Sequence, residues 1–335
     1  MRSLLSLLLV LSSFSGPAWA SPVPQPLDVH WDPGAEDCAA RAHAPQEVFR
    51  YDQRTFILRE DLCSTWEAPF VYLLVGDKQA LLIDTGDVAD PKLMPLADTV
   101  TGLLPGDKQA KLPLIVVHSH THLDHRAGDP QFQGLANVHV LPAQLAEVRA
   151  YFGLSRWPEG MAQVDLGGRV VDVLPAPGHN PAHVVYYDRG TGLLFSGDFL
   201  MAARLLVDDI VSYRASARRI ADFVRDRPVS YVLGGHVEED SKGRLYAWQA
   251  SHHPDEHALQ LGKPQVLALP AALDAFNGFR AEQDGFVIIN SMHELEAMAA
   301  AAALVLAALG YGIYRVVRYR RRKLVNRLVG PGDHD

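Results

Sequence analysis

The sequence predicts an α/β sandwich followed by a single membrane-spanning helix. Short apolar runs rich in β-branched residues alternate with helix-like segments between residues 70 and 233, which is typical of strands packed between helices. Four of these runs end at a histidine or an aspartate beside a glycine, so we expect polar side chains to gather at one edge of the sheets. The four endings are Asp84-Thr85-Gly86, Gly178-His179, Gly197-Asp198 and Gly234-Gly235-His236.

The individual elements follow from the same apolar patterns. Runs of four to six residues bounded by turn residues predict strands, and longer segments with a helical period predict helices. The predicted strands are 70–75, 80–83, 113–117, 138–141, 169–174, 183–187, 193–195 and 231–233, and the predicted helices are 91–104, 142–151 and 215–225. Residues 50–240 therefore form the main predicted domain, and the less periodic residues 241–295 form a C-terminal extension or a lid.

The first 20 residues have the pattern of a secretory signal peptide. Arg2 is followed by an apolar run over 4–11, and Ala18-Trp19-Ala20 supplies the small residues of a cleavage site. Cleavage after Ala20 leaves a proline-rich surface extension over 21–49. An uncleaved N-terminal anchor is the alternative.

The second hydrophobic segment lies near the C-terminus. Residues 297–314 carry no charge, and seven of the 31 lysines and arginines follow in 315–335. Eighteen helical residues span about 27 Å, and Val316 and Val317 extend the segment, which predicts a membrane helix over 296–317. The basic tail, 318–335, belongs on the cytoplasmic side, so the body of this single-pass protein would lie on the periplasmic side. An alanine-rich soluble helix is the alternative.

The net charge limits the class of binding partner, and the cysteine content bears on disulfide formation. Residues 21–314 hold 23 of the basic and 37 of the 39 acidic residues, a formal charge of −14, which disfavours nucleic acid as a partner. Cys38 and Cys63 are the only cysteines. Outside the cytoplasm such a pair favours a disulfide over two free thiols.

The densest polar cluster follows the apolar run Leu114 to Val117. Residues 118–125 read His-Ser-His-Thr-His-Leu-Asp-His, with four histidines and one aspartate in eight residues. Imidazole and carboxylate groups are zinc ligands, and five of them exceed the needs of one tetrahedral ion. The cluster therefore predicts two metal ions, roughly 3.5–4 Å apart as in other two-metal hydrolases.

The motif His120-x-His122-x-Asp124-His125, followed by His179, Asp198 and His236, resembles that of the metallo-β-lactamase superfamily of hydrolases. The resemblance covers residues 50–240 and implies a catalytic domain built as a four-layer αβ/βα sandwich. It also implies a ligand set: His120, His122 and His179 for a first zinc, Asp124, His125 and His236 for a second, and Asp198 as the bridge.

The resemblance assigns further roles. A shared water that loses its proton near neutral pH would attack the substrate, and Asp124 would accept the proton released. Asp84 would orient a ligand loop. His118 precedes the motif and alternates with His120, and apart from the resemblance we expect it to be buried or to support a ligand without binding metal. Iron or manganese could replace zinc.

These residues predict an exported, membrane-anchored dizinc hydrolase acting on a carbonyl-type bond of a small-molecule substrate. A thioester or a lactone is favoured over an amide, because zinc β-lactamases usually carry Cys or Ser at the position of Asp198. A mononuclear iron persulfide dioxygenase and a non-catalytic metal-binding module are the alternatives. The oligomeric state, and any partner of the basic tail, are left open.

Overall fold

A computed structural model of the chain describes residues 24–107 and 110–328. The predicted signal peptide and the end of the predicted basic tail lie outside the described residues.

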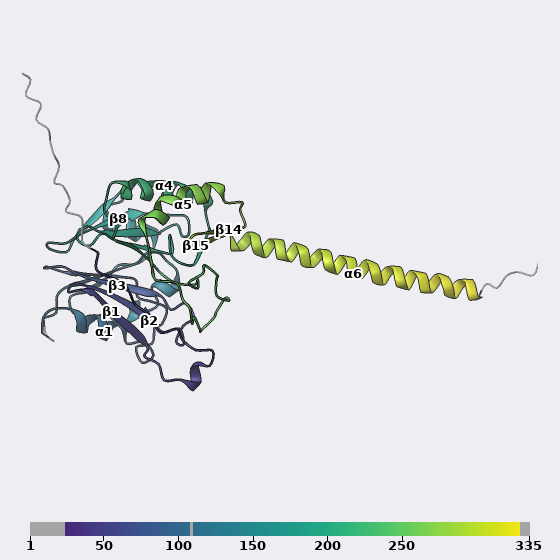
Figure 1. The fold of residues 1–335 in the computed structure, drawn as a ribbon, viewed down its shortest axis with the longest axis horizontal. Helices are drawn as coiled ribbons and strands as arrows, with labels where there is room; N and C mark the ends of the chain where they lie inside the picture. Colours follow the sequence, from purple (N-terminus) through teal and green to yellow (C-terminus); the bar gives the residue numbers. More distant parts are fainter. Residues whose placement is uncertain (1–23, 108–109, 329–335) are drawn as a thin grey trace, which may run out of the picture.

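Two six-stranded sheets face each other, and helices cover their outer faces (Figure 1). Helix α1 (Leu96–Leu103) lies outside the first sheet, and α4 (Ile210–Arg225) and α5 (Lys263–Ala275) lie outside the second. This arrangement confirms the predicted four-layer sandwich.

The first sheet has the order β1 (Gln46–Asp52), β2 (Thr55–Glu60), β3 (Phe70–Val75), β4 (Ala80–Ile83), β5 (Leu114–Val117), β6 (Val138–Val140). The second has the order β13 (Gln260–Leu261), β12 (Tyr231–Gly234), β10 (Leu193–Gly197), β9 (Val184–Asp188), β8 (Val170–Pro175), β7 (Ala162–Asp165).

The central strands form where apolar runs are buried on both faces. Every residue of β3, β4, β9 and β10 is buried, as continuous apolar sequence predicts for interior strands. Strands β3 and β4 have the bounds predicted from the sequence. Alternate side chains of these two strands join the main core between the sheets, and the others pack in a second core with α1.

Two helices differ from their predicted starts for local reasons. Helix α1 begins at Leu96 rather than residue 91, because Pro95 disfavours the helical conformation of the residue before it. Helix α4 begins at Ile210 rather than residue 215, because the Asp209 carboxylate caps it by accepting from the Val211 and Ser212 main-chain N–H groups. Two short helices, α2 (Asp129–Phe132) and α3 (Leu145–Phe152), complete the body.

The N-terminal segment is joined to the body more closely than its composition suggests. Strand β1 crosses the predicted boundary at residue 50, and Leu27 and Trp31 are buried in the main core. A disulfide links Cys38 to Cys63, as predicted.

Residues 241–295 also pack onto the body. Helix α5 lies against α4, and β13 pairs with β12. A third, three-stranded sheet has the order β11 (Arg204–Leu206), β15 (Phe286–Ile289), β14 (Arg280–Gln283). Strand β11 runs parallel to β15, so the end of this segment is bound to the middle of the chain.

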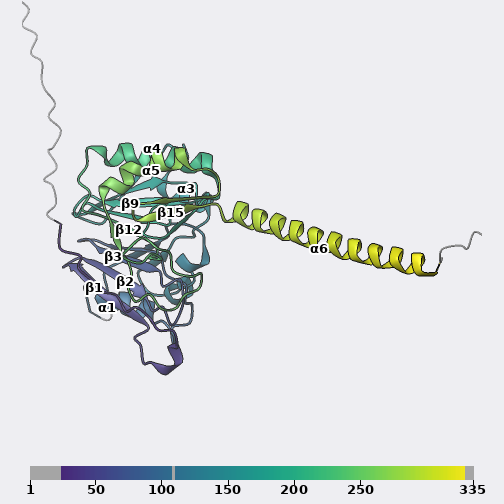
Figure 2. The same cartoon turned by 45° about the vertical axis from the view of Figure 1, so that its right-hand side comes forward.

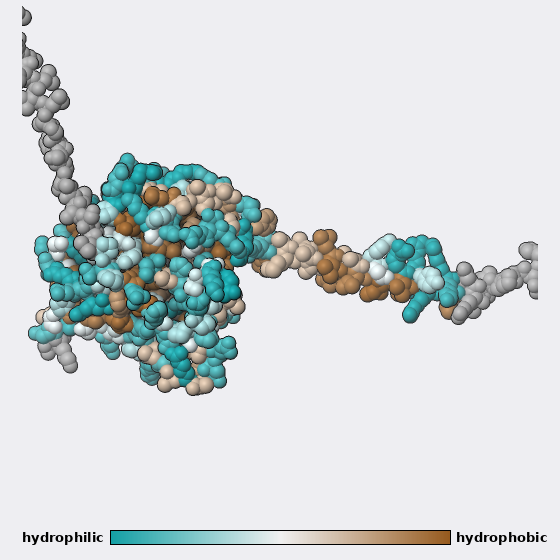
Figure 3. Space-filling view, in the orientation of Figure 1, coloured by the Kyte–Doolittle hydropathy of each residue, from teal (hydrophilic) through white to brown (hydrophobic). Residues whose placement is uncertain are grey.

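Helix α6 (Ser291–Leu328) extends away from the body as an isolated rod (Figures 1 and 2). Among the residues described, it is long and apolar enough to cross a membrane by length and composition. On the face seen in Figure 3, apolar side chains occupy the middle of α6 and end at the first basic turns.

Candidate metal centre

Strand ends from both sheets deliver the predicted ligands to one place. The histidine-rich segment leaves the carboxyl end of β5, and a single helical turn over Leu123–His125 presents the last two of its ligands. Strand β10 runs parallel to β12 with Gly197 opposite Gly234, so Asp198 and His236 leave the same edge of the second sheet. His179 lies on the loop after β8.

Three imidazoles form the first group. The distance from His120 Nε2 to His122 Nδ1 is 2.9 Å, and His179 Nε2 lies 3.3 Å from the former and 3.1 Å from the latter. Ligand nitrogens around a tetrahedral Zn²⁺ at 2.0–2.1 Å are about 3.3 Å apart. The triangle therefore has nearly the dimensions of one face of a zinc site.

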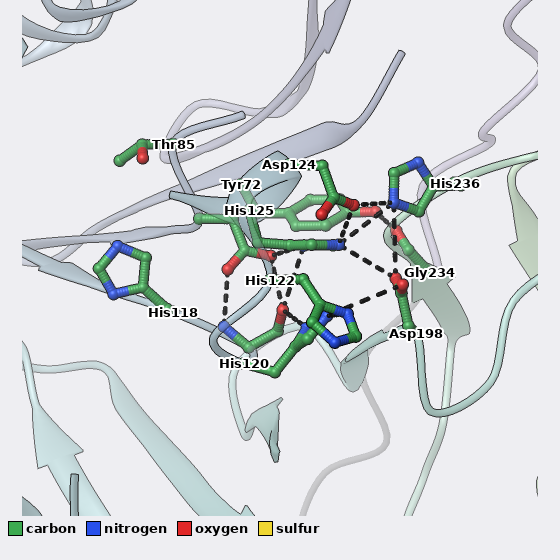
Figure 4. Close-up of polar contacts among 12 residues, drawn as sticks. Tyr72, Thr85, His118, His120, His122, Asp124, His125, Asp198, Gly234 and His236 are labelled. Atoms are coloured by element: carbon green, nitrogen blue, oxygen red, sulfur yellow. Dashed lines mark hydrogen bonds and ion pairs between the residues drawn. The ribbon is translucent and has the colours of Figure 1, made fainter. Parts of the chain in front are cut away.

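The second group contains Asp124, His125 and His236. His236 Nε2 is 3.1 Å from Asp124 Oδ2 and 3.2 Å from His125 Nε2, and His125 Nε2 is 3.1 Å from the same carboxylate oxygen. These three ligand atoms again form a compact triangle, now with one anionic oxygen (Figure 4).

Asp198 lies between the two groups and turns one oxygen to each. Oδ1 lies 3.3 Å from His125 Nε2 and 3.6 Å from His236 Nε2. Oδ2 lies 3.5 Å from His179 Nε2 and 3.9 Å from His120 Nε2. The carboxylate is buried, and no hydrogen bond to its Oδ1 is found within the described part of the chain. A buried anionic oxygen without a donor is stabilised by a cation.

Hydrogen bonds on the far side of the rings fix which nitrogen faces the centre. The Nδ1 atoms of His179 and His236 lie 3.0 Å and 2.7 Å from the main-chain carbonyl oxygens of Leu206 and Glu67. Since a carbonyl only accepts, Nδ1 carries the proton and Nε2 keeps its lone pair for a metal.

Asp84 makes the corresponding hydrogen bond to His125 from the first sheet. One oxygen of Asp84 lies 2.9 Å from His125 Nδ1 and accepts from the Ser119 hydroxyl at 2.9 Å, and the other accepts from the Ser119 N–H at 2.6 Å. Asp84 has a left-handed backbone with a φ of 67°. This unfavourable conformation is typical of a functional position held by its surroundings.

The charge balance of the second group favours a cation. Burial opposes the charged form of His236, but Asp198, Asp124 and Glu67 raise its pKa to about 10. Burial likewise opposes protonation of His125, yet nearby carboxylates, first that of Asp198, raise its pKa well above the usual range. The group therefore attracts positive charge, which a divalent metal would supply in place of protons.

The backbone leaves room for ligand atoms. A Cβ atom on Gly235 would lie 2.4 Å from Asp198 Oδ1 and 2.7 Å from His125 Cε1. Only glycine fits at this position without displacing two candidate ligands. The donor types, the two triangles and the open space at Gly235 together fit a pair of divalent cations.

His118, which was expected to be buried without binding metal, does not join the centre. The His118 ring points away from the seven candidate ligands, and its Nε2 lies 2.8 Å from Asp129 Oδ1 (Figure 4). His118 is buried as expected, but within the described residues its ring supports Asp129 and not a ligand.

Ser119 and Glu67 also contribute and were missed, because Asp84 and His236, which they contact, lie 35 and 169 residues away in the sequence. Ser119 links Asp84 to the His120 Nδ1 atom at 3.0 Å, and Glu67 provides the carbonyl that accepts from His236. His183 is fully buried, and its ring stacks on that of His120 with 5.1 Å between the centroids. Of these three residues, only His183 stood out in the sequence, because it lies four residues after His179.

Residues 64–236 match the family model of the metallo-beta-lactamase superfamily, and this match spans half of the chain and all seven candidate ligands. The chain belongs to the metallo-beta-lactamase superfamily. It is a metallo-hydrolase of that superfamily, in agreement with the resemblance seen in its motifs.

Several named relatives of this superfamily member are enzymes. It is 28% identical to a hydroxyacylglutathione hydrolase of Aeromonas hydrophila, over 68% of this chain and 88% of the relative. It is 26% identical to the human acyl-coenzyme A thioesterase MBLAC2, over 57% of this chain and 81% of the relative. A solved metallo-beta-lactamase from Pontibacter korlensis aligns with a TM-score of 0.45 and 19% identity, over 69% of this chain and all of that chain.

Proposed function

We propose that the protein is an exported, membrane-anchored dizinc hydrolase that cleaves an acyl thioester, with a lactone as the next choice. The observation that carries the proposal is the position of Asp198, which turns Oδ1 toward His125 and His236 and Oδ2 toward His120 and His179. A carboxylate facing two groups of ligands is suited to bridging two cations.

We assign the residues to two metals. His120, His122 and His179 would hold the first and Asp124, His125 and His236 the second, with Asp198 shared. When bound, a pair of divalent cations supplies an activated water and polarises the carbonyl of the substrate.

The protein's own groups position the ligands and manage the proton. Asp124 directs Oδ2 to His125 and His236, which leaves Oδ1 to accept the proton of the attacking water. Asp84 keeps the His125 proton on Nδ1 throughout the reaction. In the overall reaction water adds to the acyl carbon and the C–S bond breaks, giving a carboxylic acid and a thiol.

The relatives favour this substrate class. One is named hydroxyacylglutathione hydrolase and the other acyl-coenzyme A thioesterase, so an acyl group carried on sulfur is a suitable first test for this chain. The acidic body disfavours nucleic acid as the substrate.

The membrane assignment rests on α6. We propose that residues 296–317 cross the membrane after a signal peptide over 1–20 is removed, with 318–335 in the cytoplasm and the hydrolase in the periplasm. The arginines at 315, 318 and 320–322 follow the apolar segment, as the positive-inside rule expects. Tyr311 and Tyr314 lie just before them, where aromatic residues often mark the interface.

Metal analysis and hydrolysis of the full-length protein in detergent test the proposal. We expect two zinc ions per chain, hydrolysis of an S-acyl thioester, and loss of both zinc and activity with Asp198→Ala. Asp98→Ala, at an exposed position on α1, is the matched control and should retain both the zinc and the activity. One iron per chain with oxygen consumption would contradict the proposal and support the dioxygenase alternative.

A further inference from the structure

The candidate metal centre and the start of α6 lie on the same edge of the body, separated by one strand. The main-chain oxygen of Leu206, the last residue of β11, is 3.0 Å from His179 Nδ1. Leu206 pairs with Ile289, the last residue of the parallel strand β15, and the Val207 N–H donates to the Ile289 oxygen at 2.8 Å. The carboxyl ends of β11 and β15 thus point the same way, toward the side from which α6 leaves.

Helix α6 continues from β15 without a flexible linker. The Asn290 side chain accepts from the His293 N–H at 3.1 Å, and the Glu294 N–H donates to the Asn290 oxygen at 3.1 Å. The His293 ring in turn donates from Nδ1 to the Gly278 oxygen at 2.8 Å. The first turn of the helix is therefore fixed to the body, and the direction of α6 sets the orientation of the body.

The distance from this edge to the apolar segment is short. Residues 291–296 lie between β15 and the uncharged segment, and six helical residues span about 9 Å. The headgroup layer of a bilayer is about 5–8 Å thick on each side. If the uncharged segment crosses the membrane, the edge that carries the candidate metal centre lies at the outer boundary of the headgroup layer.

Exposed apolar side chains occur along the same edge. Five of them, which we call the apolar rim, each have 47–71% of their surface exposed: Leu123, Val211, Trp248, Phe279 and Met292. Isolated exposed apolar residues are common, so what distinguishes these five is their position beside the candidate metal centre and the start of α6.

Two residues of the apolar rim, Leu123 and Val211, lie close to the candidate metal ligands. Leu123 lies between the candidate ligands His122 and Asp124 in the sequence. Val211 is in the first turn of α4, and the preceding Asp209 N–H donates to the Gly178 oxygen, beside His179, at 2.8 Å.

Further contacts tie the rim to β11 and α6. The Trp248 ring packs against Trp66, and the Arg204 guanidinium of β11 lies 5.1 Å from its centroid. Phe279 accepts at its main-chain oxygen from the Asn290 N–H, and Met292 is in the first turn of α6. The five residues of the rim therefore lie beside the candidate ligands, beside β11 and beside the start of α6.

We infer that the apolar rim rests on the outer surface of the membrane, and that the substrate is a long-chain acyl thioester held in that surface. This inference rests on the proposed function. A long acyl chain partitions into lipid while its polar carbonyl and head group stay at the interface. The metal centre lies beside the headgroup layer, so the carbonyl can reach it while most of the chain remains in the bilayer.

The orientation can be tested without any catalysis. Val211→Cys in the full-length protein is labelled with an environment-sensitive fluorophore and reconstituted into vesicles of phosphatidylethanolamine and phosphatidylglycerol that carry a headgroup-level quencher. The two native cysteines form a disulfide, so the new thiol alone reacts. Leu135→Cys is the matched control, because Leu135 is 39% exposed and precedes β6 at the opposite edge of the sheet.

We expect the quencher to reduce the fluorescence of the label at residue 211 at least threefold more than that at residue 135. Trp248→Cys provides a second site on the rim and should behave like Val211→Cys. Equal quenching at all three positions overturns the orientation, whatever the activity of the protein.

Chain-length dependence tests the substrate class. The full-length protein in the same vesicles is assayed with butyryl and palmitoyl thioesters of N-acetylcysteamine, and we expect kcat/KM to be at least tenfold higher for palmitoyl. Val211→Glu should reduce this ratio severalfold, and Leu135→Glu should leave it unchanged. Glutamate suits the first turn of α4, so folding should be kept.

The outcomes separate the two proposals. Equal rates for the two thioesters overturn the long-chain inference and leave the proposed hydrolase in place. Absence of hydrolysis with both thioesters overturns the thioesterase function, and the long-chain substrate with it.

Discussion

The Nδ1 atom of His125 lies 2.9 Å from Oδ2 of Asp84, a carboxylate that also holds Ser119 by its hydroxyl and its main-chain N–H. Asp84 thereby connects the end of β4 to the segment that carries four of the seven candidate ligands. The second group of ligands depends on a residue that does not itself face the metal centre.

Replacing Asp84 with asparagine should weaken metal binding. An amide that turns its NH₂ toward His125 cannot accept the Nδ1 proton, so Nε2 is no longer reserved for the metal, and such changes typically cost 10–100-fold in affinity. Asparagine tolerates the left-handed backbone at this position, so the fold should be kept. Competition with a chromophoric chelator measures the affinity, with Asp98→Asn as control. An unchanged affinity would contradict the role of Asp84.

Gly235→Ala should remove metal from the second group. The new Cβ atom would lie 2.4 Å from Asp198 Oδ1, a distance that cannot be kept without moving the carboxylate. We expect metal content to fall toward one ion per chain and hydrolysis to fall at least 100-fold. Gly102→Ala, where a Cβ atom has nothing within 4 Å, should change neither. Full metal content in the Gly235 variant would argue against the assigned second group.

The stability of the protein should fall as the pH rises through the range set by Glu60. Burial raises the pKa of this carboxyl from 4.5 to about 8. Between these values the folded state binds the proton more tightly than the unfolded state, so the contribution of Glu60 to stability is lost progressively as pH rises from 4.5 to about 8. Glu60→Gln should flatten the fall of the melting temperature between pH 5 and pH 9, measured in detergent. The exposed variant Glu147→Gln should retain the wild-type slope, and an equal slope in all three proteins would exclude the effect.

Removing the disulfide should lower stability without disturbing the metal centre. Cys38 and Cys63 are 25 residues apart, and closing a loop of that length stabilises a fold by about 3 kcal/mol in the chain-entropy description. We expect Cys38→Ser/Cys63→Ser to melt several degrees lower and to bind metal as tightly as the wild type. Loss of metal at temperatures below the melting transition would show that the bridge also shapes the centre.

The sequence predicted the parts of the fold that depend on local pattern. Continuous apolar runs gave β3 and β4 with their observed bounds, and glycines beside polar residues marked the strand ends that carry Asp198 and His236. The ligand segment after β5 was recognisable because its spacing is fixed along the chain.

The remaining parts depend on contacts that spacing does not encode. Strand β1 alternates half-buried with exposed residues and carries several charges, so it resembles a loop until it pairs with β2. Strand β15 is an apolar run of four residues, but its partner β11 lies more than 80 residues earlier. The partner of His118 was missed for the same reason, because Asp129 approaches through a short helix rather than a strand.

The candidate ligands are divided between the two sheets. The first sheet contributes the histidine-rich segment after β5, and the second contributes His179, Asp198 and His236. Neither half alone offers a complete set for either ion. A cation bound here would link the two sheets through its ligands. Part of its binding free energy would therefore stabilise the folded state of the whole sandwich. Chelation should therefore loosen the entire body at once, and the supply of metal would set the lifetime of the folded protein.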